Sequence, residues 1–131
     1  MTLWRFLTPV LLSGLMACSD GHDLPKVSLE QARADHEAGR IVLIDIREPK
    51  EHATGVAAGA RLLPMSQLGQ RLGEITQPTD KPVYLICNTQ NRSQAVLSGL
   101  VEKGYRHVYY VQGGMSEWAG RGWPMVAPAV Q

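Results

Sequence analysis

The sequence predicts an α/β domain in which a small, doubly wound, mostly parallel sheet is flanked by helices. Three continuous apolar runs alternate with segments that have helical spacing. A strand covered on both faces is apolar along its whole length, so runs of this kind indicate a parallel sheet between two layers of helices. The three runs are residues 41–46, 83–86 and 108–111. Ligands of such sheets bind beyond the carboxyl ends of the strands, and functional residues are expected there.

Two helices are marked by their ends. The first is expected to begin at Ser28, where Gln31 completes a capping box, and to end at Gly39. The second is expected over residues 93–103, where apolar side chains recur on one face before Gly104. Weaker signals predict a short strand at 61–63, a short helix over 66–72 stopped by Gly73, and a last short helix from Gly113-Gly114 through Trp118.

The composition is that of one globular domain. The chain has 131 residues, of which 44% are hydrophobic and 19% charged. Its formal net charge is +1 and no basic tract is present, so nucleic acid is not an expected partner. No cysteine and histidine cluster has the spacing of metal ligands, and we expect no metal and no cofactor. We expect the domain to be monomeric.

The first 17 residues differ from the rest of the chain. Arg5 is followed by an uncharged, mostly apolar run of twelve residues, 6–17. A membrane-spanning helix needs about 20 apolar residues, so the run is typical of a secretory signal peptide instead. It ends in Leu15-Met-Ala-Cys18, which resembles the lipobox of bacterial lipoproteins. The resemblance implies cleavage before Cys18 and lipid attachment to that residue.

We therefore expect residues 1–17 to be a signal peptide, 18–27 a lipidated cysteine and tether, 28–127 the folded domain, and 128–131 a tail. A lipid on Cys18 would anchor the protein to a membrane in the cell envelope, on its periplasmic side. Ser19 resembles the address of outer-membrane lipoproteins, so the outer membrane is one possible destination. The alternative is a plainly secreted protein in which Cys18 keeps an unmodified thiol.

Cys87 stands out because of its place in the chain. The sequence has two cysteines, and acylation of Cys18 would leave Cys87 as a lone thiol. Cys87 follows the strand 83–86 directly, and a polar loop leads from it to the next helix. A helix N-terminus has unpaired N–H groups and a partial positive charge, and Arg92 adds a full charge. Both favour an anion at the loop, such as a thiolate or a persulfide.

The alternative is that Cys87 is a small buried hydrophobic residue at a strand end. Its polar neighbours would then be ordinary turn and cap residues. These neighbours are Asn88, Thr89, Gln90, Asn91 and Ser93.

Residues 42–126 resemble the single-domain form of the rhodanese, or thiosulfate sulfurtransferase, family. Four motifs match the family in the same order along the chain. They are Asp45-Ile-Arg47-Glu48 with the acid Glu51, Gly59-Ala60, the loop Cys87 to Ser93, and Gly113-Gly114-Met-Ser-Glu-Trp118. Four residues lie between Cys87 and Arg92, which is the sulfurtransferase length, whereas related phosphatases have one more.

The resemblance implies that Cys87 is the catalytic nucleophile that carries sulfane sulfur as a persulfide. It implies that Arg92 is a second catalytic residue, which orients the loop or binds substrate. The donor would be a small sulfur compound such as thiosulfate, and the acceptor a thiol. Asp45 and Arg47 would brace the loop, although a surface ion pair worth about 0–1 kcal/mol is the alternative for these two residues. The substrate-binding loop would consist of Asn88, Thr89, Gln90, Asn91, Arg92 and Ser93.

Two positions depart from the family pattern. Gln90 stands where the family often has glycine, so either its backbone is unusual or the loop does not need glycine there. The segment Gly55-Val56-Ala57 lacks the usual His-Ile. A rival hypothesis therefore remains open, in which the domain binds or senses a ligand at the cell envelope and Cys87 does not turn over.

Overall fold

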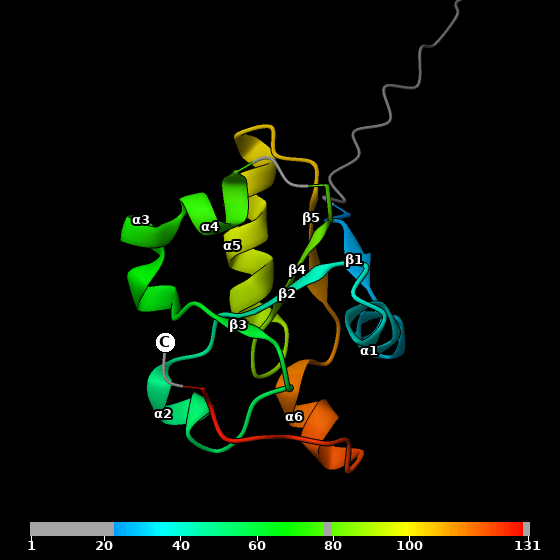
Figure 1. Ribbon diagram of the computed structural model, residues 1–131. Coiled ribbons are helices and arrows are strands. Elements are labelled where there is room, and N and C mark those ends of the chain that lie inside the picture. The colour runs from blue at the N-terminus through cyan, green and yellow to red at the C-terminus, as the bar shows by residue number, and fades with distance from the viewer. Residues whose placement is uncertain (1–22, 78–79, 130–131) are drawn as a thin grey trace, which may run out of the picture.

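The structure, a computed structural model, describes residues 23–77 and 80–129 and contains a five-stranded sheet with helices on both faces (Figure 1). All paired strands run parallel, in the order β1-β5-β4-β2-β3. This confirms the predicted fold class. The strands are β1 (Lys26–Val27), β2 (Val42–Asp45), β3 (Arg61–Leu62), β4 (Val83–Ile86) and β5 (Val108–Val111).

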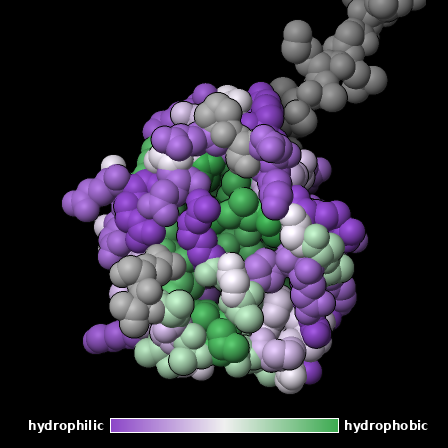
Figure 2. Space-filling view, viewed as in Figure 1, coloured by the Kyte–Doolittle hydropathy of each residue, from purple (hydrophilic) through white to green (hydrophobic). Residues whose placement is uncertain are grey.

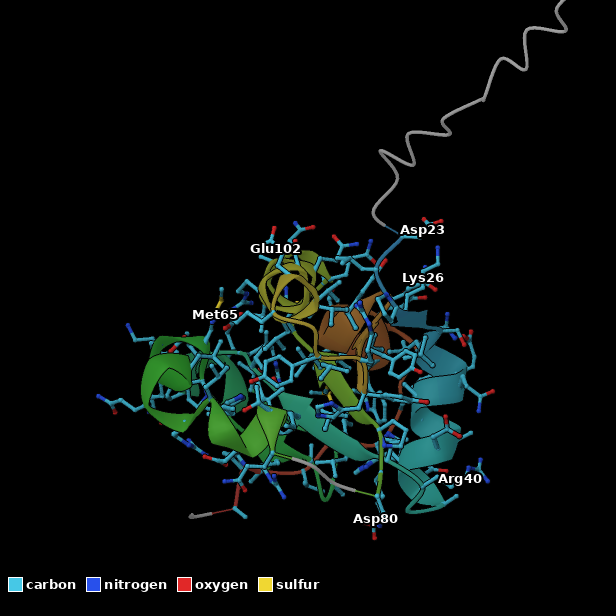
Figure 3. The ribbon with its side chains drawn as sticks, turned by 90° about the horizontal axis from the view of Figure 1, so that it is seen from above. Asp23, Lys26, Arg40, Met65, Asp80 and Glu102 are labelled. Carbon is cyan, nitrogen blue, oxygen red and sulfur yellow. The ribbon has the colours of Figure 1, made fainter. Side chains whose placement is uncertain are left out.

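The helices divide between the two faces of the sheet. Helices α3, α4 and α5 pack on one face, and α1 and α6 pack on the other. Seen from above, α5, which ends at Glu102, and α1, which Arg40 follows, lie on different sides of the strands (Figure 3). The helices are α1 (Leu29–Glu37), α2 (Pro49–His52), α3 (Leu68–Arg71), α4 (Gly73–Thr76), α5 (Asn91–Glu102) and α6 (Gly114–Gly120), with a 3₁₀ turn, η1, at Met65–Gln67.

The central strands are largely apolar because successive side chains enter opposite halves of the core. In β4, Leu85 packs under α5, whereas Tyr84 and Ile86 pack toward α1 and α6. All four residues of β4 are buried. Polar residues cover most of the face shown in Figure 2, and hydrophobic residues reach the surface in the middle of it. Within residues 23–77 and 80–129, no helix is long and apolar enough to cross a membrane.

The N-cap of the first helix is confirmed, and one of the two bonds of the predicted capping box is present. Ser28 is the N-cap of α1, and its hydroxyl accepts a hydrogen bond from the backbone N–H of Gln31 at 3.1 Å. Gly39 follows the helix with a φ of 68°, a left-handed conformation that glycine adopts without strain.

The sheet begins earlier than expected. The tether predicted over 18–27 overlaps β1, because Lys26 and Val27 pair with Tyr110 and Val111 of β5. The N–H of Tyr110 also donates to the carbonyl of Pro25 at 3.0 Å. Two residues carry too short a pattern to predict a strand, and β1 forms only because β5 offers it an edge. Cys18 and the predicted signal peptide lie outside the described residues.

Two helix boundaries differ from the prediction, and one short helix was not expected. Gly73 does not stop the helical segment, since α4 begins there with a right-handed backbone. Helix α5 begins at Asn91, two residues before the predicted start at Ser93. Helix α2 was not predicted, because four residues that begin with Pro49 carry no periodic apolar signal.

A buried carboxylate, that of Asp35, joins α1 to the sheet. Asp35 is 8% exposed and accepts hydrogen bonds from the Tyr84 hydroxyl at 2.7 Å, Gln31 Nε2 at 2.9 Å and Arg40 Nε at 3.0 Å. These bonds, with that from Tyr84 the largest contribution, hold the pKa of Asp35 below its ordinary value. The charged carboxylate is thus tied into the fold.

We expect Tyr84→Phe to lower the free energy of unfolding by about 1–2 kcal/mol at neutral pH, because Asp35 loses a buried donor. The pKa of Asp35 is depressed in the folded state, so its contribution is complete above its unfolded pKa and is lost as the pH falls below that value. The difference between wild type and variant should therefore shrink between about pH 5 and pH 2, as measured by urea unfolding at several pH values. Tyr109→Phe on the neighbouring strand is the control and should show no such pH dependence.

Candidate active site

Cys87 directly follows β4, at the carboxyl edge of the sheet, and its thiol is buried. The residue is 1% exposed, and its side chain belongs to the apolar cluster under α5. The surroundings are nevertheless not wholly apolar, because Sγ lies 3.2 Å from the hydroxyl oxygen of Ser93, which is also buried. This burial agrees with the alternative in which Cys87 is only a packing residue. The contact with the Ser93 hydroxyl does not, because a purely apolar packing site would have no polar partner for the sulfur.

The Ser93 hydroxyl can serve two partners, although it has a single proton. Its oxygen lies 3.2 Å from the carbonyl oxygen of Gln90 as well as 3.2 Å from Cys87 Sγ. When the hydroxyl donates to Gln90, a neutral thiol can donate to the hydroxyl oxygen. When Cys87 is a thiolate, the hydroxyl can rotate and donate to the sulfur instead. The Ser93 hydroxyl can therefore accept a hydrogen bond from the neutral thiol and donate one to the thiolate.

The loop after Cys87 is oriented by helix α6, which lies beside it (Figure 1). The N–H of Met115 donates to the carbonyl of Cys87, and that of Ser116 to the carbonyl of Asn88, both at 2.8 Å. In a trans peptide the C=O and N–H groups point in opposite directions. The N–H groups of Asn88 and Thr89 therefore point away from α6.

The loop amides are available as donors. Among the described residues, none accepts a hydrogen bond from the backbone N–H groups of residues 88–93. The last of these belong to the first turn of α5, where N–H groups have no partner within the helix. Helix α5 is twelve residues long and adds its partial positive charge at the same end. The carboxyl end of β4 thus carries the donors expected of an anion cradle.

Gln90, at the position where glycine was expected, has a negative φ. Its φ is −151°, and no residue other than glycine has a positive φ in the described part of the chain. Its side-chain oxygen accepts a hydrogen bond from the N–H of Gly113 at 3.2 Å. The loop needs no glycine at this position, and Gln90 gives it a further connection to the start of α6.

Gly114 is the glycine that the loop requires. It has a φ of +57°, and a Cβ built on it would lie 2.2 Å from the carbonyl oxygen of Thr89 and 2.5 Å from those of Asn88 and Cys87. Three consecutive carbonyl groups of the loop therefore converge on this one position. The sequence predicted a tight turn at Gly113-Gly114, and the close approach of the loop is an additional reason for glycine.

Arg92 is held by Glu51. Its two terminal nitrogens donate to the two carboxylate oxygens of Glu51 at 2.7 and 2.6 Å, and each side chain is 33% exposed. Hydrogen bonding to Arg92 is the main reason that the pKa of Glu51 falls to about 2. Sequence reasoning quoted Glu51 only as part of a motif and did not place it in the site. The sequence signal that could have placed Glu51 in the site is its position in the motif that begins at Asp45 and Arg47.

Asp45 and Arg47 form a buried pair, so the alternative of a surface ion pair is wrong. They are 0% and 2% exposed, and Arg47 reaches both carboxylate oxygens of Asp45, the shorter contact being 2.8 Å. Arg47 also donates to the carbonyls of Gly55 at 2.8 Å and Glu51 at 3.3 Å. The pair joins the end of β2 to helix α2, which carries Glu51.

His52 lies beside this pair with one nitrogen unsatisfied. Its Nε2 is 3.3 Å from an oxygen of Asp45, but the angle is not that of a hydrogen bond. The side chain is 5% exposed, and Nε2 has no hydrogen-bond partner within the described residues. His52 therefore lies beside the Asp45–Arg47 pair, and no hydrogen bond or ion pair in the described part of the chain joins it to Cys87.

Comparison with known proteins agrees with this geometry. The family profile described as "Rhodanese-like domain" matches residues 28–121. A sulfurtransferase of Allochromatium vinosum is 37% identical over 107 residues, covering 82% of this chain and 96% of that protein. A thiosulfate sulfurtransferase of Tolumonas auensis, GlpE, is 34% identical over 93 residues, covering 71% of this chain and 86% of that protein.

Among solved structures, a rhodanese-related protein of Thermoplasma volcanium superimposes with a TM-score of 0.68. It is 26% identical, and the match covers 79% of this chain and 99% of that one.

We expect Gly114→Ala to lower the free energy of unfolding by at least about 2–3 kcal/mol. A left-handed backbone costs an alanine about 1–2 kcal/mol, and overpacking against the loop carbonyls adds about 1–3 kcal/mol. Gly120→Ala in the same helix is the matched control, because a Cβ there meets no atom within 4 Å. It should be neutral or slightly stabilising in thermal denaturation. Equal stability of the two variants would contradict the close approach at Gly114.

Proposed function

The chain belongs to the rhodanese-like domain family, and we propose that it is a sulfurtransferase that moves sulfane sulfur through a persulfide on Cys87. The donor is a small compound such as thiosulfate, and the acceptor is a thiol. Unpaired N–H groups of residues 88–93 beside the Cys87–Ser93 contact support this proposal most directly. Relatives named sulfurtransferase and thiosulfate sulfurtransferase support the same chemistry.

In the first step, the Cys87 thiolate attacks the outer sulfur of thiosulfate. A new bond forms between Cys87 Sγ and that sulfur while the S–S bond of thiosulfate breaks. Sulfite leaves with the bonding electron pair, and the enzyme holds Cys–S–S⁻. The negative charge thereby moves from Sγ to the terminal sulfur. N–H groups arranged around the loop can stabilise the charge in both positions, as donors aimed at a developing anion do.

In the second step, the thiolate of an acceptor attacks the terminal sulfur of the persulfide. The bond between the two sulfur atoms on Cys87 breaks, and the acceptor leaves as its own persulfide. The Cys87 thiolate returns and can accept a donation from the Ser93 hydroxyl. Neither step needs an oxidant or a reductant.

A second candidate function is a binding or sensing domain that does not turn over. The burial of Cys87, at 1% exposed, favours it, because reactive cysteines are usually partly exposed. In this case the loop amides would hold a sulfur anion or a partner without bond exchange. Substitution of Cys87 separates the two functions, since transfer needs the sulfur and binding by amides does not.

Incubation of the purified domain with thiosulfate should add one sulfur atom to its intact mass. Reduction should remove the added sulfur, and Cys87→Ala should show no gain, because the persulfide forms on that residue. Ser93→Ala should load sulfur about 10-fold more slowly, since the thiolate loses one donor. A wild-type domain that binds thiosulfate with unchanged mass would instead support the binding function.

We further propose that a lipid on Cys18 anchors the chain in the cell envelope, with the outer membrane as one possible location. The topology suits such an anchor. Asp23, where the described chain begins, precedes β1 and so lies at the amino edge of the parallel sheet, whereas Cys87 follows β4 at the carboxyl edge (Figure 1). A membrane at the amino edge would leave the loop open to solutes on the far side of the domain.

Expression of the full chain in a bacterium with labelled palmitate should label the wild type and leave Cys18→Ser unlabelled. The wild type should sediment with membranes, whereas the variant should not, because it lacks the acylated residue. Cys87→Ser is the control and should be labelled and sedimented like the wild type. An unlabelled wild type would show that Cys18 is not lipidated.

A further inference from the structure

The charge of Arg92 is already balanced within the protein. Glu51 takes one N–H from each terminal nitrogen of the guanidinium, at 2.7 and 2.6 Å. This end-on arrangement is the one by which a guanidinium grips a carboxylate or another oxyanion with two parallel bonds. An anion that enters the site therefore meets an arginine whose end-on edge is filled.

Glu51 is itself held in place by hydrogen bonds at helix α2. One of its carboxylate oxygens accepts the N–H of Glu48 at 2.8 Å, which closes the first turn of that helix. Its carbonyl accepts a bond from the buried Arg47. Glu51 is thus positioned by the fold and is not a surface acid that happens to lie near Arg92.

A second carboxylate lies on the same side of the loop. Glu48 accepts bonds from the N–H of Ser66 at 2.9 Å and from its hydroxyl at 2.8 Å, and its charge also acts on Arg92. Arg92 is therefore paired with Glu51 and also lies within the electrostatic field of Glu48. The charge of Arg92 at the sulfur is offset by these acids, whereas the loop amides and the start of α5 add positive potential there without a net charge. Backbone N–H groups can bind a sulfur atom that is uncharged or carries one negative charge. Each further negative charge on the sulfur compound is repelled by Glu48 and Glu51.

We propose, on the premise that the chain transfers sulfur, that Glu51 is a positioning residue that makes the site discriminate against dianionic donors. The preferred substrate class is a sulfane donor with at most one negative charge at its reacting head, such as an organic persulfide or a thiosulfonate. Thiosulfate is accepted, but its second charge is a disadvantage.

Two donors of matched chemistry test this inference. Thiosulfate is a dianion, whereas the methanethiosulfonate anion carries one charge and offers the same kind of outer sulfur. Attack by the Cys87 thiolate transfers that sulfur in both cases and releases sulfite or methanesulfinate with the electron pair of the broken S–S bond. The ratio of kcat/KM for thiosulfate to kcat/KM for methanethiosulfonate therefore reports on donor charge, and a loss of activity common to both donors cancels.

Glu51→Gln should raise this ratio about three- to tenfold, because it removes the negative charge that is paired with Arg92 and keeps the shape of the side chain. Glu51→Ala should raise the ratio by a similar factor, and it replaces Glu51→Gln in the test if that variant folds poorly. Glu51→Asp keeps the charge but is too short to hold both nitrogens of Arg92. It should lower kcat for both donors and leave the ratio within about twofold of the wild type.

Glu102→Gln is the control for net charge. Glu102, labelled in Figure 3, ends α5 about 15 Å along the helix from Arg92, and it is exposed. Its substitution should leave the ratio unchanged. An unchanged or lower ratio in Glu51→Gln, with both donors loading Cys87, would overturn the role of Glu51 and leave sulfur transfer intact. Failure of both donors to load the wild type would overturn the transferase function, and this inference with it.

Discussion

The loop after Cys87 keeps its shape because its carbonyl groups are held on one side. Helix α6 donates to the carbonyls of Cys87 and Asn88, and the carbonyl of Thr89 converges with them on Gly114. Planar peptides then turn the N–H groups of Asn88 and Thr89 to the other side. Because the carbonyl groups of Cys87 and Asn88 already have hydrogen-bond partners in α6, the loop can hold its N–H groups toward a ligand without leaving those carbonyls unpaired. The site therefore depends on a contact between two segments far apart in the sequence.

A chain of charged groups connects the loop to the sheet. Asp45 holds Arg47 at the end of β2, Arg47 reaches the carbonyl of Glu51 in α2, and the carboxylate of Glu51 holds Arg92. The first pair is buried and the last is one-third exposed. Loss of one partner from a buried pair leaves an uncompensated charge and is strongly destabilising, whereas exposed pairs contribute little to stability. The inner pair thus fixes α2, and the outer pair sets the charge that a donor meets.

Burial of Cys87 and reactivity toward sulfur are compatible in this arrangement. A sulfur atom packed against apolar side chains is protected from bulky oxidants, and its polar contacts are concentrated on the loop side, where Ser93 lies. The exposed residues of the loop are Asn88, Thr89 and Asn91. A donor of a few atoms needs only a narrow approach. Small sulfur compounds and the tip of a thiol acceptor fit that requirement better than large esters do.

Local periodicity and residues adjacent in the chain were enough to predict the parallel sheet, the capped helix after Ser28 and the position of Cys87 at a strand end. Four further features became visible only in the folded chain: the burial of Asp45 and Arg47, the extension of the sheet by β1, the packing of the loop on Gly114 and the pairing of Glu51 with Arg92. Glu51 and Arg92 are 41 residues apart. Such contacts produce no periodic pattern in a single sequence. They depend on which strands lie side by side in the sheet and not on the sequence neighbours of either residue.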